Sequence, residues 1–107
     1  MGKLERDFQA GLIKEIRDLL PGCVVLKNDA NYQQGIPDLS IFHGDRWATL
    51  EVKKSDREET QPNQEYFVNL MNGMSFSAFI TPENKDEILD ELQQALRPRR
   101  KTRVSQC

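Results

Sequence analysis

Apolar side chains recur along the chain with two different periods, and these periods predict three helices and four strands. Six apolar residues between positions 3 and 20 recur every three or four positions, as on one face of a helix: Leu4, Phe8, Leu12, Ile16, Leu19 and Leu20. Pro21 and Gly22 end this helix. Short runs rich in β-branched and aromatic residues predict strands at 23–27, 37–42, 47–54 and 76–81.

Two further helices follow from the same spacing. The second is expected over residues 61–72, with Thr60 as its N-cap. Its buried side is expected to carry Tyr66, Phe67, Leu70, Met71 and Met74. Thr81 and Pro82 are expected to cap and open the last helix. The apolar stripe of that helix consists of Ile88, Leu89, Leu92, Ala95 and Leu96.

The resulting order of elements is α-β-β-β-α-β-α. Residues 43–46 form a tight turn, so the second and third strands make a hairpin. The strand after the second helix joins the sheet by a crossover, which gives a mixed sheet with helices on both faces. The 107 residues suffice for one compact α/β domain. We place this domain at 1–96 and expect 97–107 to be a disordered tail.

Composition excludes several classes of protein. No stretch approaches the roughly 20 consecutive apolar residues that a membrane span needs. The first residues, MGKLERDFQ, carry charges where a secretory signal has its apolar run. We therefore expect a soluble, cytoplasmic protein. Cys23 and Cys107 show neither metal-ligand spacing nor a disulfide framework, and the single histidine, His43, cannot build a zinc site alone.

The net charge of −2 conceals an asymmetry between the body and the tail. The last eleven residues contain five bases and no acid, at Arg97, Arg99, Arg100, Lys101 and Arg103. The preceding 96 residues therefore hold ten bases and 17 acids, a net charge of −7. Such a tail fits an arm that contacts a phosphate backbone, and it equally fits a solvated chain end.

The hairpin places two acids unfavourably. A turn centred between Gly44 and Asp45 makes one face of the hairpin uniformly apolar, and a slip by one residue would exchange the faces. On the other face Asp38 then lies opposite Glu51, where like charges are destabilising. Lys53 projects from the same face, two residues beyond Glu51. The alternative interpretation is an ordinary ion cluster on the surface of a hairpin.

A third acid, Glu5, lies within roughly 20° of the centre of the apolar stripe of the first helix. An inward carboxylate is costly unless it is paired, protonated or bound to a cation. Three carboxylates that can converge beside an ammonium suit Mg²⁺, which would polarise a phosphoryl group and lower the pKa of a water. Alternatively, Glu5 reaches solvent or interacts with the helix dipole.

The residues of the hairpin carry a family resemblance. Gly35-Ile36-Pro37-Asp38-Leu39, with Glu51-Val52-Lys53 placed so that thirteen positions separate Asp38 from Glu51, resembles the PD-(D/E)XK nuclease signature. In particular, the chain is similar to the small stand-alone VRR-NUC-type nucleases of phage and bacterial mobile elements. The resemblance covers about residues 3–96 and implies a restriction-endonuclease-like α-β-β-β-α-β core, to which this chain adds a C-terminal helix.

The resemblance also implies roles for the matching residues. The implied metal ligands are Asp38, Glu51 and the backbone carbonyl of Val52, with Glu5, which matches the first-helix acid of the family, as a further candidate. The cation would be Mg²⁺, with Mn²⁺ as a substitute, and Lys53 would act on the attacking water. Gln64 matches a glutamine that orients the substrate or the lysine. By its position on the helix, Gln64 is equally a plain surface residue.

The leading hypothesis is a Mg²⁺-dependent DNA endonuclease. Because the body is acidic, DNA needs local contacts, for which we nominate Lys27, Tyr32, Lys54, Arg57, Arg99, Arg100 and Lys101. Tyr32 would stack on a base. The resemblance further implies a homodimer that acts on branched DNA, such as a four-way junction. The alternatives are a non-catalytic DNA-binding or protein-interaction module on the same fold, and an unrelated acidic α/β adaptor with a cationic tail.

Overall fold

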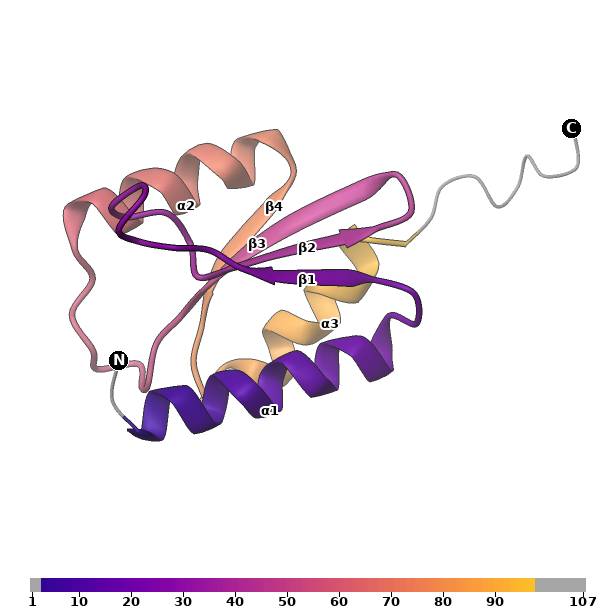
Figure 1. Cartoon of the computed structure of the whole chain (residues 1–107), viewed down its shortest axis with the longest axis horizontal. Coiled ribbons are helices and arrows are strands. Elements are labelled where there is room, and N and C mark those ends of the chain that lie inside the picture. The colour runs from indigo at the N-terminus through magenta and orange to yellow at the C-terminus, as the bar shows by residue number, and fades with distance from the viewer. Residues whose placement is uncertain (1–2, 98–107) are drawn as a thin grey trace, which may run out of the picture.

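The computed structural model describes residues 3–97, which fold into three helices and four strands in the predicted order (Figure 1). The helices are α1 (Lys3–Leu19), α2 (Pro62–Met74) and α3 (Lys85–Ala95). The strands are β1 (Val24–Lys27), β2 (Leu39–His43), β3 (Arg46–Val52) and β4 (Phe76–Ile80). The nominated tail residues Arg99, Arg100 and Lys101 lie outside the described residues.

The sheet is mixed, as the order of elements predicted. Its strands are arranged β1-β2-β3-β4; the first three are antiparallel, and β4 pairs parallel with β3. Parallel neighbours need a crossover connection, and α2 supplies it. The hairpin has the predicted register, with Leu39 opposite Leu50 and Phe42 opposite Trp47. Gly44, at a φ of 64°, provides the left-handed conformation in the turn.

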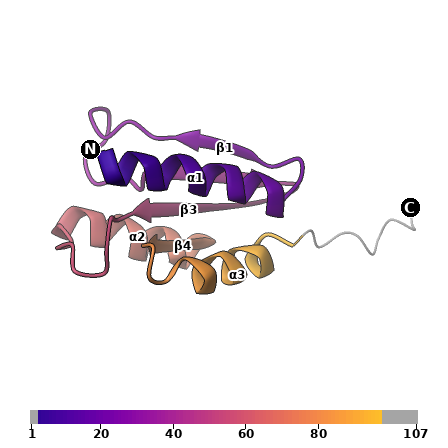
Figure 2. The same ribbon diagram turned by 90° about the horizontal axis from the view of Figure 1, so that it is seen from below.

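The helices cover the two faces of the sheet unequally. α1 and α3 lie on one face, and α2 lies alone on the other, over β3 and β4 (Figure 1 and Figure 2). The main core lies between the sheet and the α1–α3 layer, and its most deeply buried side chains include Leu12, Ile16, Leu39, Ile41, Leu50, Val52, Ile80, Leu92 and Leu96. The alternate strand residues face α2. Among them, Thr49 donates a hydrogen bond to the Ser77 hydroxyl at 2.7 Å, so this second face is the more polar one.

The orientation of α2 differs from the prediction. Val68 is buried, whereas Tyr66, Leu70 and Met74 are 60%, 40% and 63% exposed. The prediction that these three side chains face the core was wrong, because α2 has apolar residues on two sides and turns the side with Gln64 toward the sheet. An apolar stripe therefore remains on the outside of α2.

The predicted N-caps were wrong by one position for α2 and by three positions for α3. Gln61, and not Thr60, precedes α2. Asn84, and not Thr81, precedes α3. Oγ1 of Thr81 accepts a hydrogen bond from the backbone N–H of Asn84 at 3.1 Å, and Oδ1 of Asn84 accepts one from the backbone N–H of Thr81 at 2.8 Å. This turn delays the start of the helix. Within residues 3–97, no helix has the length and apolar character needed to cross a membrane.

Candidate active site

Asp38 lies at the end of the sheet where β2 begins and β3 ends. The backbone pairing of the two strands ends at Leu39 opposite Leu50, one position short of the predicted Asp38–Glu51 pair. Instead, Oδ2 of Asp38 accepts a hydrogen bond from the backbone N–H of Val52 at 3.0 Å. Burial raises the pKa of Asp38, although this hydrogen bond opposes the shift. Asp38 is thus fixed against the strand that carries Glu51.

Glu51 is nearly inaccessible, with 4% of its surface exposed. Its Oε2 accepts a hydrogen bond from Nε2 of Gln64 at 3.0 Å, while its buried Oε1 has no hydrogen-bond partner among the described residues. Burial and, next, the negative charge of Asp38 raise the pKa of Glu51 to about 8. A buried acceptor without a partner is costly, so this carboxyl group is suited to take up a cation or a proton.

Lys53 is also buried, with 4% of its surface exposed. Its Nζ donates to Oε1 of Gln64 at 2.7 Å and to the carbonyl oxygen of Glu59 at 3.4 Å, and lies 5.9 Å from the centre of the Phe79 ring. The amide of Gln64 therefore connects Lys53 to Glu51. This contact places Gln64 in the cluster, which the helix position alone did not decide.

Glu5 reaches the same end of the molecule from the first turn of α1. Partial burial, followed by the charges of Glu58 and Asp38, raises the pKa of Glu5. Glu58 was not predicted. Its Oε1 accepts a hydrogen bond from the backbone N–H of Lys54 at 2.8 Å, and its Oε2 lies 3.9 Å from Nζ of Lys53. Because Glu58 belongs to an irregular loop, no periodicity indicated it.

The oxygen donors suit a hard divalent cation. Asp38 and Glu51 supply carboxylates, and Oε1 of Glu51 has a lone pair that nothing described occupies. Residues 3–97 contain no group of three or more Asp, Glu, His or Cys side chains arranged to hold a metal ion. Mg²⁺ is usually held by one or two carboxylates together with waters and substrate phosphate. The residues present fit this mode of binding.

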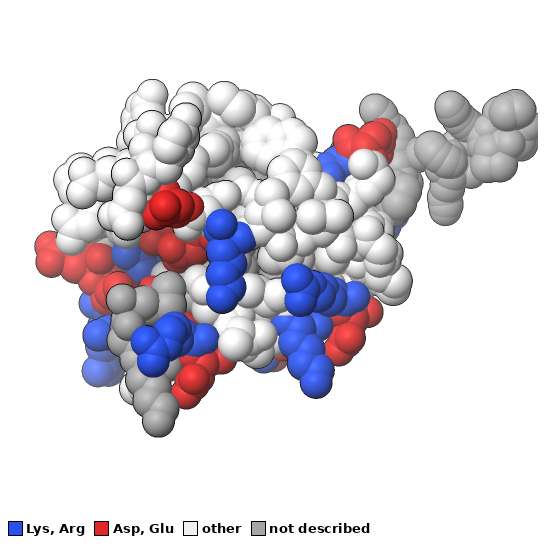
Figure 3. All heavy atoms as spheres, viewed as in Figure 1, with Lys and Arg blue, Asp and Glu red and all other residues white. Residues whose placement is uncertain are grey.

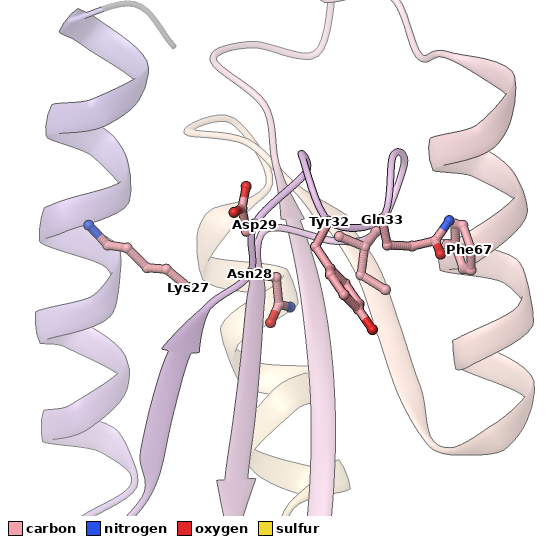
Figure 4. Close-up of a pocket in the computed structure, with 7 residues that line it drawn as sticks. Lys27, Asn28, Asp29, Tyr32, Gln33 and Phe67 are labelled. Atoms are coloured by element: carbon pink, nitrogen blue, oxygen red, sulfur yellow. The ribbon is translucent and has the colours of Figure 1, made fainter.

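The nominated DNA contacts within residues 3–97 are all exposed: Lys27, Tyr32, Lys54 and Arg57. Lys27 extends from the end of β1 toward α1 (Figure 4). On the face shown in Figure 3, Lys and Arg are mixed with Asp and Glu, and the region of α2 is almost free of charge. The Lys and Arg side chains on this face therefore lie apart from one another and do not form one continuous strip.

The loop between β1 and β2 packs closely against the start of α2. Gly35 has a φ of 90°, and a Cβ at this position would lie 2.8 Å from Cβ and 2.9 Å from the backbone oxygen of Asn63. We expect Gly35→Ala to lower the free energy of unfolding by about 2 kcal/mol or more, through backbone strain and this clash. Urea unfolding would measure the change.

Gly22→Ala is the matched control for this substitution. Gly22 has a similar φ of 88° but open space around its Cβ position, so the difference between the two variants isolates the contact with Asn63. Equal losses of stability in both variants would contradict the close packing of the loop on α2.

Several solved structures share this fold, among them these two. One, described as a VRR_NUC domain, has a TM-score of 0.65 and 20% sequence identity, over 87% of this chain and 97% of that chain. Another, described as a VRR_NUC domain protein, has a TM-score of 0.63 and 14% identity, over 90% of each chain. No protein-family model and no curated protein matches the sequence. The chain therefore has the α/β fold of VRR_NUC domains, as its signature predicted.

Proposed function

We propose that this protein is a Mg²⁺-dependent DNA endonuclease, in which Mn²⁺ can replace Mg²⁺. The observation that carries the proposal is the buried arrangement in which Gln64 bonds both Lys53 and Glu51, beside Asp38, on a VRR_NUC-like sheet. Burying charged groups costs free energy, whereas an ion cluster on the solvated surface does not incur this cost. A catalytic cluster gives a reason to bear that cost.

Each side chain of the cluster would have a distinct role. Asp38, Glu51 and the carbonyl of Val52 would hold the cation, with Glu5 as a further candidate. When bound, the cation supplies polarisation of the phosphodiester and a lower pKa for the attacking water. Lys53 would orient that water and offset the negative charge that develops on the phosphoryl oxygens. Gln64 is a positioning residue, because it holds the Lys53 ammonium.

The substrate that we propose is DNA, including branched DNA such as four-way junctions, in the cytoplasm. The exposed Lys27, Lys54 and Arg57 would contact phosphates, and the basic residues at 97–103 would add to this binding. Each of these contacts neutralises phosphate charge without reading the base sequence. DNA structure, more than sequence, would then determine where the enzyme binds.

A cleavage assay tests this function. Labelled linear duplex, single strand, flap and four-way junction would be incubated with the protein and Mg²⁺, Mn²⁺ or a chelator. We expect cleavage with either metal and none with the chelator. Binding without cleavage under all conditions would favour the non-catalytic DNA-binding module. The absence of both binding and cleavage would favour the acidic adaptor.

We also propose that the protein forms a homodimer through the outside of α2. Tyr66, Leu70 and Met74 are spaced four residues apart, so they form one exposed apolar stripe. The only charged residue in this helix is Glu65. Contiguous exposed apolar side chains mark protein–protein interaction sites when the patch is large enough, which supports a dimer contact here.

Leu70→Glu is expected to convert a dimer into a monomer, because it would place two like charges in the contact between copies. Sedimentation equilibrium would measure the mass. The control is Asn69→Glu, at an exposed position next to the stripe, which should leave the mass unchanged. A wild-type protein that sediments as a monomer at all concentrations would contradict the proposal.

A further inference from the structure

A hollow of about 540 Å³ lies beside the candidate active site (Figure 4). Its size falls within the range of small-molecule sites, roughly 300–1,000 Å³. The lining residues come from the end of β1, the loop that follows it, and α2: Lys27, Asn28, Asp29, Tyr32, Gln33, Ile36 and Phe67. The residues proposed for the metal site do not line this hollow.

The walls of the hollow are fixed by hydrogen bonds. Nδ2 of Asn28 donates to the carbonyl of Pro37 at 2.9 Å and to the hydroxyl of Ser40 at 2.8 Å. Within the loop, the backbone N–H of Tyr32 donates to the carbonyl of Asp29 at 3.0 Å. The close approach of Gly35 to Asn63 joins the far side of the loop to α2. The hollow is therefore formed before any ligand enters.

The chemistry of the lining suits a flat, uncharged, polar-edged ligand. Tyr32 is 91% exposed, so one face of its ring is free for stacking. Figure 4 shows Gln33 extending toward Phe67, which offers a second ring on α2. An amide such as that of Gln33 both donates and accepts hydrogen bonds, as the edge of a nucleobase requires.

The charges of the lining disfavour a phosphate in the same place. Asp29 is an exposed acid in the loop. Lys27, the one base among the lining residues, extends toward α1 and away from Tyr32 and Phe67 (Figure 4). An anion would therefore meet a carboxylate and no inward cation, whereas a neutral base meets rings and an amide.

The hollow lies next to the candidate active site, because neighbouring residues of the same chain segments line both. Gln64 and Phe67 are three residues apart on α2, so their side chains lie on the same face, roughly 5–6 Å apart at Cβ. Gln64 contacts Glu51 and Lys53, and Phe67 lines the hollow. On the other side, the backbone N–H of Asn28 donates to the carbonyl of Asp38 at 2.8 Å. One nucleotide can therefore span both places.

We propose that the hollow binds one unpaired nucleobase, that of a nucleotide adjoining the phosphate at Asp38 and Glu51. This inference rests on the proposed function for the position of that phosphate, and it adds a requirement on the substrate. The base that enters the hollow stacks on Tyr32 and Phe67 and must be free of its complementary strand. The substrate class is then DNA that is unpaired, or readily unpaired, at the point of cleavage.

The test compares two short labelled strands with the same number of phosphates. One strand consists of abasic nucleotides throughout, and the other carries a single base at its centre. Binding to the full-length protein would be measured by fluorescence anisotropy with Ca²⁺ in place of Mg²⁺, and the strands checked for integrity afterwards. Because phosphate contacts are equal, the ratio of the two dissociation constants reports the base alone.

We expect the single base to tighten binding about 5- to 150-fold, the range for one stacked base. Tyr32→Leu and Phe67→Leu should each reduce this ratio toward one, while both proteins remain folded by circular dichroism and keep the wild-type affinity for the abasic strand. The control Phe42→Leu removes an exposed ring at the other end of the hairpin and should leave the ratio intact.

Equal affinity of the wild-type protein for the two strands would overturn the proposal. It would also fail if Tyr32→Leu and Phe67→Leu changed the sedimenting mass and left the ratio unchanged, because the hollow would then be a contact between protein chains. The cleavage assay is separate from this measurement. Cleavage without a base effect would contradict only the proposed base site. A base effect without cleavage would contradict only the proposed nuclease activity.

Discussion

Lys53→Met is expected to slow DNA cleavage by on the order of 10³-fold, with little change in the affinity for DNA. Methionine retains an apolar stem of similar length but has no ammonium group. The buried Nζ of Lys53, held 2.7 Å from Oε1 of Gln64, would no longer orient water or offset phosphoryl charge. Single-turnover cleavage of a labelled junction, at saturating protein, would measure the rate of the chemical step.

Lys14→Met is the matched control, because Lys14 is exposed on α1 and has no part in the proposed site. It removes the same charge from the protein and should leave the rate of the chemical step unchanged. The melting temperature of each variant would show that the fold is retained. Equal rates for the two variants would contradict the role assigned to Lys53.

The metal-free protein is expected to lose stability as the pH rises from about 4.5 to about 8. The folded protein holds a proton on Glu51 up to a pKa of about 8, against an ordinary value of 4.5. An acid with a raised folded pKa binds more protons in the folded state, so its stabilising effect is complete below its unfolded pKa and disappears as the pH passes its folded pKa. At about 1.4 kcal/mol per pKa unit, the loss is on the order of 5 kcal/mol.

Burial acts in the same direction on Asp38 and Glu5, whose pKa values are also raised. Urea unfolding in a chelator, at a series of pH values, would measure the slope. Glu51→Gln should remove most of it, because the amide does not ionise. Glu91→Gln, on the exposed side of α3, should leave the slope unchanged. A flat stability profile for the wild-type protein would refute this interpretation of Glu51.

Added Mg²⁺ should restore stability to the wild-type protein most strongly near pH 8. A cation binds the ionised carboxylates, so binding replaces the proton of Glu51 and stabilises the folded state by mass action. Glu51→Gln should show little of this gain. A Mg²⁺ effect of the same size in both proteins would place the ion elsewhere.

The hairpin and the position of its acids could be predicted from the sequence, because both depend only on residues close together in the chain. Strand residues alternate between faces, and a tight turn determines their pairing, so the position of Asp38 beside Glu51 follows from the turn at Gly44. Lys53 follows from the same alternation. The signature shared with known nucleases, and not the helix position, indicated Gln64. Its bonds to Glu51 and Lys53 required the structure.

Other features depend on how distant segments pack. Glu58 lies in a loop without period, so its approach to Lys53 was not visible in the sequence. The stripe of Tyr66 and Leu70 was assigned to the core because spacing identifies an apolar side but does not choose between two of them. Phe67 was assigned to the same buried side, and its place in the wall of a hollow depends on the loop that faces it.

The parallel pairing of β3 with β4 has a consequence for the order in which the site forms during folding. The contact of Asp38 with Val52 closes a short hairpin, whereas the backbone N–H of Lys53 donates to the carbonyl of Ile80 across the whole α2 crossover. Contacts between distant residues form more slowly than local ones. Asp38 and Glu51 therefore come together early, whereas the contacts of Lys53 with Phe79 and Ile80 form only when β4 docks. In a nascent chain the cluster around Lys53 is therefore complete only after β4 has been synthesised.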